Sequence, residues 1–524
     1  MFKHMRGMKK IINAALVLLM VGSVAGCGAS SAEETAGKAV GISDKEPAQG
    51  QMNIEIPVQI PGILVDQNGY NIESDKVVVF KGKKLPKTFQ IIDMETNQVV
   101  YTGDVVKPTF DENSDYFYAV GRFNELKNRG QYYIYADYLG ESYSFRIAED
   151  IYSEVFTEAC KKYYINRCGI AISEGLAGDN GHSACHTTPA HLKEDSSTTI
   201  DVLGGWHMDD KADRDTLLGS RIVENLLLSY EMDKAAFGDD LGIPESGNNI
   251  PDILDEAKYE VDWLLKMQDP KTGGVFGAAL TENSGMADVF AAPVEVTAVS
   301  MEATISFAAA LARFSFFYQQ YDPEYATSII RAADRAWECY LNNQRASSNT
   351  ASFKAAAQLY RATGNEKYEA VLKAYFGRTD FETLFNTDEN ILLGAVTYLS
   401  TNQHVDKDIC SELIKYLMKK SELIAKEASD SRYLTSVIAV DGDFSQFLDD
   451  IRCLTITNHI IYNHEYTTII ENHLHYLMGM NPEAMNYLTS GTERTYLDSK
   501  DKNNIMNNPH SDSIIVFMLS GLKK

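Results

Sequence analysis

Apolar residues recur at helical spacing over most of the chain after residue 150. Between Asp215 and Met232, for example, they fall on one face of a predicted helix: Leu217, Leu218, Ile222, Leu226 and Leu227. The same pattern predicts about twelve helices, at 150–166, 214–233, 250–268, 294–320, 324–343, 350–363, 366–376, 389–401, 406–427, 444–463, 464–479 and 511–522. Twelve helices joined by mostly short loops favour six helical hairpins closed in a ring.

Residues 54 to about 148 follow a different pattern. Short β-branched and aromatic runs are separated here by Asn-Gly, Gly and Pro, and they read IPVQI, KVVVF, FQIID, VVYTG, YFYAVG, QYYIYAD and YSFRIA. This pattern is typical of a small β-sandwich. A chain of 524 residues is also too long for one ordinary core. We therefore predict a multidomain protein, with a small all-β sandwich at 53–148 followed by an all-α barrel at 149–524.

The first 27 residues resemble a bacterial lipoprotein signal. Lys9 and Lys10 form a basic region, an apolar run extends from Ile11 to Val21, and the sequence VAGC ends at Cys27 as in a lipobox. The resemblance implies that Cys27 is lipidated and holds the protein on the extracellular face of the bacterial membrane. Residues 28–52, rich in Ala, Gly, Ser, Glu and Lys, are predicted to form a flexible tether. An ordinary secretion signal is the alternative.

The chain is strongly acidic, with a formal net charge of −25. Such a surface repels nucleic acid and anionic lipid, which argues against a nucleic-acid partner and leaves the lipid anchor as the expected contact with the membrane. A neutral polysaccharide is compatible with this charge. The seven cysteines are too sparse for a disulfide scaffold in a chain of this length.

Three stretches carry a resemblance to a known family. GGWH at 204–207 and IPESGNNIPDILDEA at 243–257 are nearly identical to the entrance of the catalytic domain in glycoside hydrolase family 9, the cellulase family. ILVDQNGYNIESDKVVVF at 63–80 is similar to the immunoglobulin-like module that precedes many of these domains. The resemblance implies an (α/α)6 barrel supported by an immunoglobulin-like sandwich. It also implies inverting hydrolysis of cellulose or another β-glucan.

Four residues offer soft or borderline metal ligands: Cys168, Cys185, His186 and His207. Two thiolates and two imidazoles are a common tetrahedral zinc set, although the wide spacing is weak evidence by itself. The resemblance implies a structural zinc ion at these four positions. His182 and His191 compete for a ligand role, and the two cysteines could instead form a disulfide or simply be buried. Whether calcium also binds is not readable from the sequence.

Inverting hydrolysis needs two carboxyl groups, a base that activates water and an acid that protonates the leaving oxygen. In the family, the base side comes from the two aspartates of DAGD after GGWH, and the acid is a glutamate near the C-terminus. Here these positions fall on Met208, on Lys211 and on Asn504 or a neighbour. A thioether accepts a proton poorly, and an ammonium group has the wrong charge for a base. We therefore predict a degenerate hydrolase that binds or senses β-glucan.

Two other functions stay open at this point. Asp209 and Asp210 stand beside the substituted positions and could supply a displaced base, in which case the protein would still be an active cellulase. Alternatively, the cleft is vestigial and the barrel serves as a surface scaffold. Trp206 is the candidate for stacking on a sugar ring, because it adjoins this loop.

Overall fold

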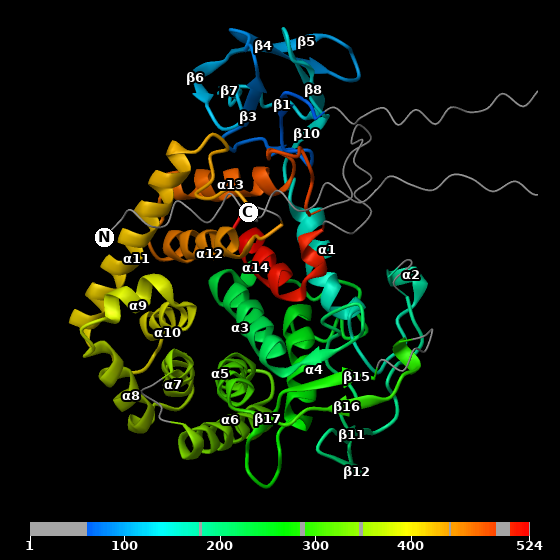
Figure 1. Cartoon of the computed structure of the whole chain (residues 1–524), viewed down its shortest axis with the longest axis vertical. Coiled ribbons are helices and arrows are strands. Elements are labelled where there is room, and N and C mark those ends of the chain that lie inside the picture. The colour runs from blue at the N-terminus through cyan, green and yellow to red at the C-terminus, as the bar shows by residue number, and fades with distance from the viewer. Residues whose placement is uncertain are drawn as a thin grey trace, which may run out of the picture. The chain divides into compact units, whose positions relative to one another are not determined.

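The computed structural model in Figure 1 describes residues 60–177, 181–282, 289–344, 349–439, 442–488 and 504–522, all within one compact unit, Val58–Lys524. The expected signal, Cys27, the tether and most of the IPVQI run lie outside these residues. No helix among the described residues is both long enough and apolar enough to cross a membrane.

The N-terminal part is a sandwich of two β-sheets. One sheet has the order β1-β3-β7-β6, with bounds Ile63–Leu64, Val77–Gly82, Tyr116–Arg122 and Val106–Asp111. The other has the order β2-β10-β8-β4-β5, with bounds Tyr70–Asn71, Phe145–Ala148, Gly130–Ala136, Thr88–Asp93 and Val99–Asp104, and β9 (Gly140–Glu141) pairs with β8. Alternate residues of β4 point into the core, so Phe89 and Ile91 are buried while Thr88 and Gln90 are exposed. The predicted all-β sandwich is confirmed.

Twelve of the described helices form two concentric rings, which lie below the sandwich in Figure 1. The inner ring consists of α3 (Thr216–Met232), α5 (Met301–Tyr318), α7 (Thr350–Thr363), α10 (Glu389–Leu399), α12 (Ser445–Ile460) and α14 (Pro509–Ser520). The outer ring consists of α1 (Ser153–Ile165), α4 (Asp252–Lys266), α6 (Pro323–Asn343), α8 (Glu366–Phe376), α11 (Lys407–Asp430) and α13 (His464–Leu477). This arrangement confirms the predicted (α/α)6 barrel.

The two rings differ in the apolar pattern of their helices. The inner helix α5 is buried on nearly every side, and its sequence MEATISFAAALARFSFFY has one charged residue after its first turn, Arg313. The outer helix α6 buries a single stripe that includes Ile329, Ala333, Ala336 and Tyr340. An outer helix faces water on its other side, which is why its apolar residues keep the three-to-four spacing.

The sequence pattern misplaced one boundary by seven residues and several others by two or three, and it missed several elements. The predicted helix at 294–320 starts only at Met301, because 294–300 forms β16 (Val294–Val296) and β17 (Val299–Ser300). β16 belongs to a sheet of order β12-β11-β16-β15-β13, with bounds Asp195–Ile200, Ala190–Leu192, Val294–Val296, Ala278–Thr281 and Arg214–Asp215. β14 (Val275–Phe276) pairs with β17, and the short helices α2 (Glu174–Ala177) and α9 (Phe381–Thr387) were also not predicted.

The sandwich is joined to the barrel through buried polar contacts. The carboxylate of Asp66 lies 2.8 Å from Nδ1 of His475 on α13, and both side chains are fully buried. The backbone N–H of Gln67 donates to the carbonyl of Met478 at 2.8 Å, and its side-chain amide donates to the carbonyl of Ala484 at 2.6 Å. These contacts leave the sandwich as a support that packs on the outer ring of the barrel.

Candidate functional site

The GGWH loop at 204–207 leads into α3 and is held from below by α4. The backbone N–H of Trp206 donates to Oε2 of Glu260 at 2.8 Å, and the guanidinium of Arg214 donates to the carbonyl of Gly204 at 2.9 Å. Gly205 has φ of +80°, and a Cβ atom there would lie 2.6 Å from the Trp263 ring. Glycine is therefore required for the loop to approach α4 so closely.

Two buried carboxyl groups of the IPESGNNIPDILDEA segment and its helix support this loop. Burial raises the pKa of Glu256 to about 7, despite hydrogen bonds from the Arg167 guanidinium. Burial raises the pKa of Glu260 to about 8, because the Trp206 N–H offsets only part of the desolvation. Oε1 of Glu260 would lie 2.0 Å from a Cβ atom at Gly219, so that α3 packs directly onto this carboxyl group. The residues that carry the resemblance thus act as a scaffold for the loop.

Glu260 gives a prediction about stability and pH. Its folded pKa of about 8 exceeds the ordinary value of 4.5, so the stability it contributes is complete below about pH 4.5 and is lost as the pH rises through about 8. Glu260→Gln keeps an oxygen for the Trp206 N–H but cannot ionise. We expect the free energy of unfolding of this variant, relative to that of the wild type, to rise by on the order of 2–4 kcal/mol between pH 5 and pH 9.

Urea unfolding at the two pH values measures this difference. The control is Glu412→Gln, because Glu412 is an exposed residue of α11 that pairs only with a neighbouring lysine. A stability difference between Glu260→Gln and the wild type that is the same at pH 5 and pH 9 would contradict the prediction.

The four predicted metal ligands lie together beside the GGWH loop. The ligand atoms of Cys168, Cys185, His186 and His207 all lie within 4.8 Å of one another, and the four residues are buried. The two Sγ atoms are 3.7 Å apart, Sγ of Cys168 is 3.4 Å from Nδ1 of His186, and Sγ of Cys185 is 3.5 Å from Nε2 of His207. Both cysteines are free, so the alternative of a disulfide between them is wrong.

The protonation states of the thiols and imidazoles in this cluster favour binding of a metal cation. The hydrogen bond with Cys168 holds the pKa of Cys185 far below that of an ordinary thiol, so the pair readily carries one thiolate. Burial lowers the pKa of His207, which keeps its ring neutral. Nε2 of His186 lies 3.1 Å from the Val289 carbonyl, so this nitrogen carries the hydrogen and Nδ1 presents its lone pair to the sulfur atoms. A thiolate and neutral imidazoles are the forms that bind metals.

The two competing histidines lie outside this cluster. Nδ1 of His182 is 2.7 Å from the Ser183 carbonyl, and its ring stacks on Phe290 with centroids 4.6 Å apart. His191 instead belongs to a second group that could hold a metal ion, with Glu282 and Glu295, but all three side chains are partly exposed. The ammonium of Lys193 lies 2.8 Å from Glu295 and already compensates one of these carboxylates.

The acidic loop after GGWH uses its carboxylates to cap the backbone. Oδ1 of Asp209 accepts from the backbone N–H groups of Lys211 and Asp213, at 3.0 and 3.1 Å. Asp213 accepts from the Thr281 N–H at 2.7 Å, and Asp215 caps α3 by accepting from the Leu218 N–H at 2.8 Å. Asp210 is exposed. Both displaced-base candidates are therefore exposed, and Oδ1 of Asp209 is engaged by the turn.

A cavity of about 490 Å³ lies at the N-terminal ends of α10, α12 and α14, beside Asn504. Asn504 caps the 3-10 turn η5 (Ile505–Asn507): its Oδ1 accepts from the Met506 N–H at 2.9 Å, and its Nδ2 donates to the Leu488 carbonyl at 3.2 Å. Three carboxyl groups and an imidazole also line this cavity: Glu389, Asp443, Asp449 and His510. An amide thus occupies the expected acid position while carboxyl groups stand nearby.

One guanidinium joins two of the carboxyl groups in this cavity. Arg452 on α12 contacts Glu389 at 2.7 Å through one nitrogen and Asp449 at 2.7 Å through the other. Burial alone would raise the pKa of Glu389, but Arg452 and neighbouring cations lower it to about 2. Burial raises the pKa of Asp449, and it lowers the pKa of His510 to about 4. The sequence pattern did not indicate this group, because its members lie on three different helices.

Comparison with known proteins identifies the fold and its family. The model of glycosyl hydrolase family 9 matches residues 152–514, and that of the cellulase N-terminal immunoglobulin-like domain matches residues 59–141. The chain belongs to glycosyl hydrolase family 9. Endoglucanase D of Acetivibrio thermocellus is 27% identical over 437 residues, which cover 77% of this chain and 69% of the relative. A cellodextrinase of Butyrivibrio fibrisolvens is 27% identical over 476 residues, which cover 83% and 85%.

A solved family 9 endoglucanase of metagenomic origin has the same fold. Its TM-score to this chain is 0.77 at 22% identity, and the match covers 87% of this chain and 98% of that one. The family 9 assignment directs attention to the loop after GGWH and to the segment before α14. In this chain Met208 is half-buried on that loop, with its N–H donated to the Asp213 carbonyl at 2.8 Å, and Lys211 is exposed.

Trp206 occupies a different position from the one expected of a sugar-stacking residue. Its side chain is fully buried, and its ring packs on Tyr163 with centroids 5.0 Å apart. A pyranose ring needs an exposed aromatic face, so Trp206 is a core residue in this structure. Trp206 contributes to the site through its backbone N–H, which donates a hydrogen bond to Glu260.

Proposed function

We propose that this family 9 protein binds β-glucan chains at the cell surface and that its hydrolytic activity is lost or weak. The observation that carries the proposal is the contrast between scaffold and chemistry. The GGWH loop keeps its buried supports in Arg214 and Glu260, while the resemblance puts the family's carboxylate positions on Met208, on Lys211 and on Asn504 or a neighbour. The names of the relatives, an endoglucanase and a cellodextrinase, support a β-glucan as the ligand.

Side-chain chemistry explains the expected loss of turnover. A general base must accept a proton from water, and a general acid must donate one to the leaving oxygen. The thioether of Met208 and the ammonium of Lys211 do not serve as bases, and the amide of Asn504 does not serve as an acid at neutral pH. Each missing acid or base costs roughly 10²–10⁴-fold in rate. Binding needs no proton transfer, so we expect it to survive these replacements.

We further propose that Cys168, Cys185, His186 and His207 hold a structural zinc ion. Around a tetrahedral zinc ion, with Zn–S of about 2.3 Å and Zn–N of about 2.0–2.1 Å, two sulfur ligands lie about 3.8 Å apart, and a sulfur and a nitrogen ligand lie about 3.5–3.6 Å apart. The distances of 3.7, 3.4 and 3.5 Å in the cluster match these separations. Four protein ligands close the coordination shell, so the ion would fix the loops without activating water.

The zinc cluster is also supported by local backbone conformation. His186 has φ of +48°, in the left-handed region, which an L-residue enters at a cost of about 1–2 kcal/mol. A metal bond to its ring would offset that cost. The ion would hold two segments together, because His207 belongs to the GGWH loop and Thr281, beside His186, belongs to β15.

The sequence of the first 27 residues supports attachment through a lipid on Cys27, which would place this glucan-binding unit outside the cell.

Glucan binding is tested with the purified chain that begins after the signal. We expect calorimetry with cello-oligosaccharides and soluble mixed-linkage β-glucan to show saturable binding, and insoluble cellulose to retain the protein. Sugar release from the same glucans is expected to stay at least 10²-fold below that of an active family 9 enzyme. Absence of binding to every β-glucan tried would overturn the proposal.

An active hydrolase with displaced carboxylates is the second candidate, and the cavity beside Asn504 favours it. Environments that push the pKa values of two neighbouring carboxyl groups apart are typical of acid–base pairs. Glu389, whose pKa is about 2, and Asp449, whose pKa is raised, meet that description. This candidate requires sugar release that Glu389→Gln removes in a folded variant. Release that disappears instead in the Asp209→Ala, Asp210→Ala double variant would place the base on the loop after GGWH.

A further inference from the structure

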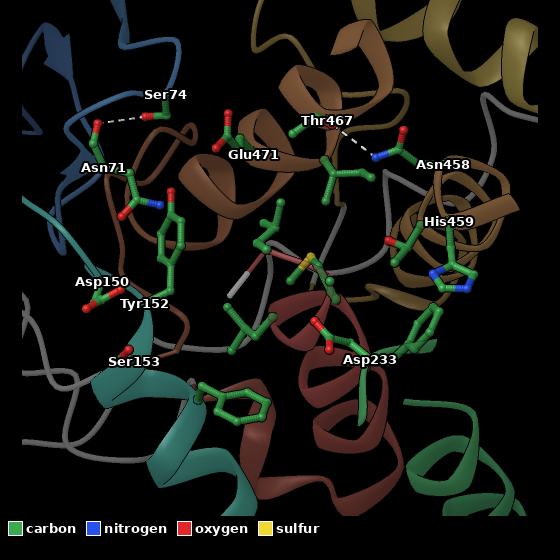
Figure 2. A pocket seen from close by; sticks show the side chains of 18 of the residues that line it. Asn71, Ser74, Asp150, Tyr152, Ser153, Asp233, Asn458, His459, Thr467 and Glu471 are labelled. Atoms are coloured by element: carbon green, nitrogen blue, oxygen red, sulfur yellow. Dashed lines mark hydrogen bonds between the residues drawn. The ribbon is translucent and has the colours of Figure 1, made fainter. Parts of the chain in front are cut away.

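A second cavity, of about 480 Å³, lies far from the candidate site (Figure 2). It is formed where the loop after β2 of the sandwich meets α1 and the C-terminal ends of α3, α12 and α14. The GGWH loop precedes the other end of α3, and a helix of 17 residues is about 25 Å long. The cavity is therefore a site distinct from the candidate site around the GGWH loop.

The base of this cavity is apolar. Phe156, Ile470, Phe517 and Leu519 line it and are almost completely buried, and Met232 adds a flexible thioether. A volume of this size with an apolar lining and a few polar groups is typical of a small-molecule site. The apolar lining disfavours a sugar, whose ring carries hydroxyl groups around its whole edge.

Tyr152 supplies a polar group that lacks a partner. Its side chain is 4% exposed and lines the cavity, and its hydroxyl has no hydrogen-bond partner among the described residues. Figure 2 shows the ring directed into the cavity, with Asp233 and Glu471 at other positions around it. A buried hydroxyl that makes no hydrogen bond costs free energy, and a ligand in the cavity would remove that cost.

The charges around this cavity favour a cation. Five carboxylates line it, from Glu73, Glu149, Asp150, Asp233 and Glu471, and none of the described residues that line it is lysine or arginine. Glu73 and Glu149 form ion pairs with Lys127 and Arg129, which do not line the cavity, so the attraction comes mainly from the other three. The helices α3, α12 and α14 all point their C-terminal ends at it, and Asp233 is the C-cap of α3. The C-terminal end of a helix carries partial negative charge and attracts cations. The helix ends and the carboxylates thus both make the electrostatic potential in the cavity more negative.

We propose that this cavity binds a small organic cation, an amine with an apolar portion. The carboxylates of Asp233 and Glu471 attract the ammonium group from different sides of the cavity, and the Tyr152 hydroxyl is a hydrogen-bonding partner for the ligand. The apolar portion rests on Phe156, Met232 and Phe517. The exposed Tyr462 also lines the cavity.

Three probes of equal size and different charge test the proposal: 4-phenylbutylamine, 4-phenylbutanol and 4-phenylbutyrate. Calorimetry at pH 7 on the chain that begins after the signal is expected to show the amine binding at least about 10-fold more tightly than the alcohol, because its hydrogen bonds are charge-assisted. The carboxylate probe is expected to bind most weakly. Asp233→Asn keeps the amide-capping oxygen that Ala235 uses and should weaken the amine about 10-fold while leaving the alcohol unchanged.

Two further variants separate the cavity from general surface charge. Tyr152→Phe is expected to weaken the amine several-fold, and Glu412→Gln, an equal charge change on exposed α11, is expected to have no effect. Equal affinity for amine and alcohol, or no binding of any probe, would overturn the proposal. So would binding that appears only in a chain ending at Leu522, since the chain's own Lys523 and Lys524 would then be the occupants. Cello-oligosaccharide that displaces the amine would show a single shared site and would also overturn it.

Discussion

Replacing Cys185 with serine is expected to abolish stoichiometric zinc binding and to lower the stability of the protein by about 4 kcal/mol, the value for free zinc at a thousand times its dissociation constant. The reason is that a closed four-ligand site contributes its binding energy to the folded state only. Cys185 is the central ligand of the cluster, with Cys168 at 3.7 Å and His207 at 3.5 Å. Zinc content of the purified protein and thermal melting with and without EDTA measure the effect.

The matched control for the zinc prediction is Cys410→Ser. Cys410 is a half-buried free cysteine on α11, outside the cluster. This variant should keep one zinc ion per chain and the same response to EDTA as the wild type. Zinc that remains bound to Cys185→Ser at full stoichiometry, or a wild-type melting temperature that EDTA leaves unchanged, would show that the cluster is not a structural zinc site.

Restoring the family's carboxylates is expected to have the largest effect on activity. A triple variant with Met208→Asp, Lys211→Asp and Asn504→Glu supplies a base and an acid to a loop that Arg214 and Glu260 already hold in place. We expect sugar release from soluble β-glucan to rise at least about 10²-fold over the wild type. Loss of the Asn504 cap on η5 costs about 1 kcal/mol of stability, which a chain of this size tolerates.

The control for this variant carries the isosteric amides at the same positions, Met208→Asn, Lys211→Asn and Asn504→Gln. It makes the same changes in size without a titratable group, so its sugar release should stay at the level of the wild type. A folded carboxylate variant that binds glucan and still releases no sugar would mean that the loss of activity lies elsewhere in the groove. High activity of the wild type itself would favour Glu389 and Asp449 as the working pair.

The sequence predicted those elements whose signals are local. The bounds of α7 and α8 were predicted to the residue, because an apolar stripe ends at Gly364 and Asn365 begins the next helix by accepting from the Lys367 N–H. The runs KVVVF, FQIID, VVYTG, YFYAVG, QYYIYAD and YSFRIA also predicted β3, β4, β5, β7, β8 and β10, since a short β-branched and aromatic run needs no distant partner, whereas β6 and the two-residue strands were not predicted. The start of α5 was misplaced because 294–300 pairs with strands such as β11, about a hundred residues away.

The candidate site also has features that the sequence predicted and features that it did not. The four metal ligands could be proposed from residue type and family resemblance, but their wide spacing did not show that they meet within 4.8 Å. Nothing in the sequence indicated that Glu389, Asp449 and Arg452 would share one cavity, because charged residues on a helix usually face water. Only closure of the ring turns their faces inward, where Arg452 pairs with both acids.

The sequence by itself determined the sandwich, the barrel and the family, since these depend on residue identity and on spacing within single elements. The tertiary structure alone decided that Trp206 is buried, that the thiols and imidazoles converge, and that three helix ends and a free tyrosine hydroxyl enclose a second cavity. Each of these depends on distances between segments far apart in the chain, and such distances are set by packing of the whole barrel.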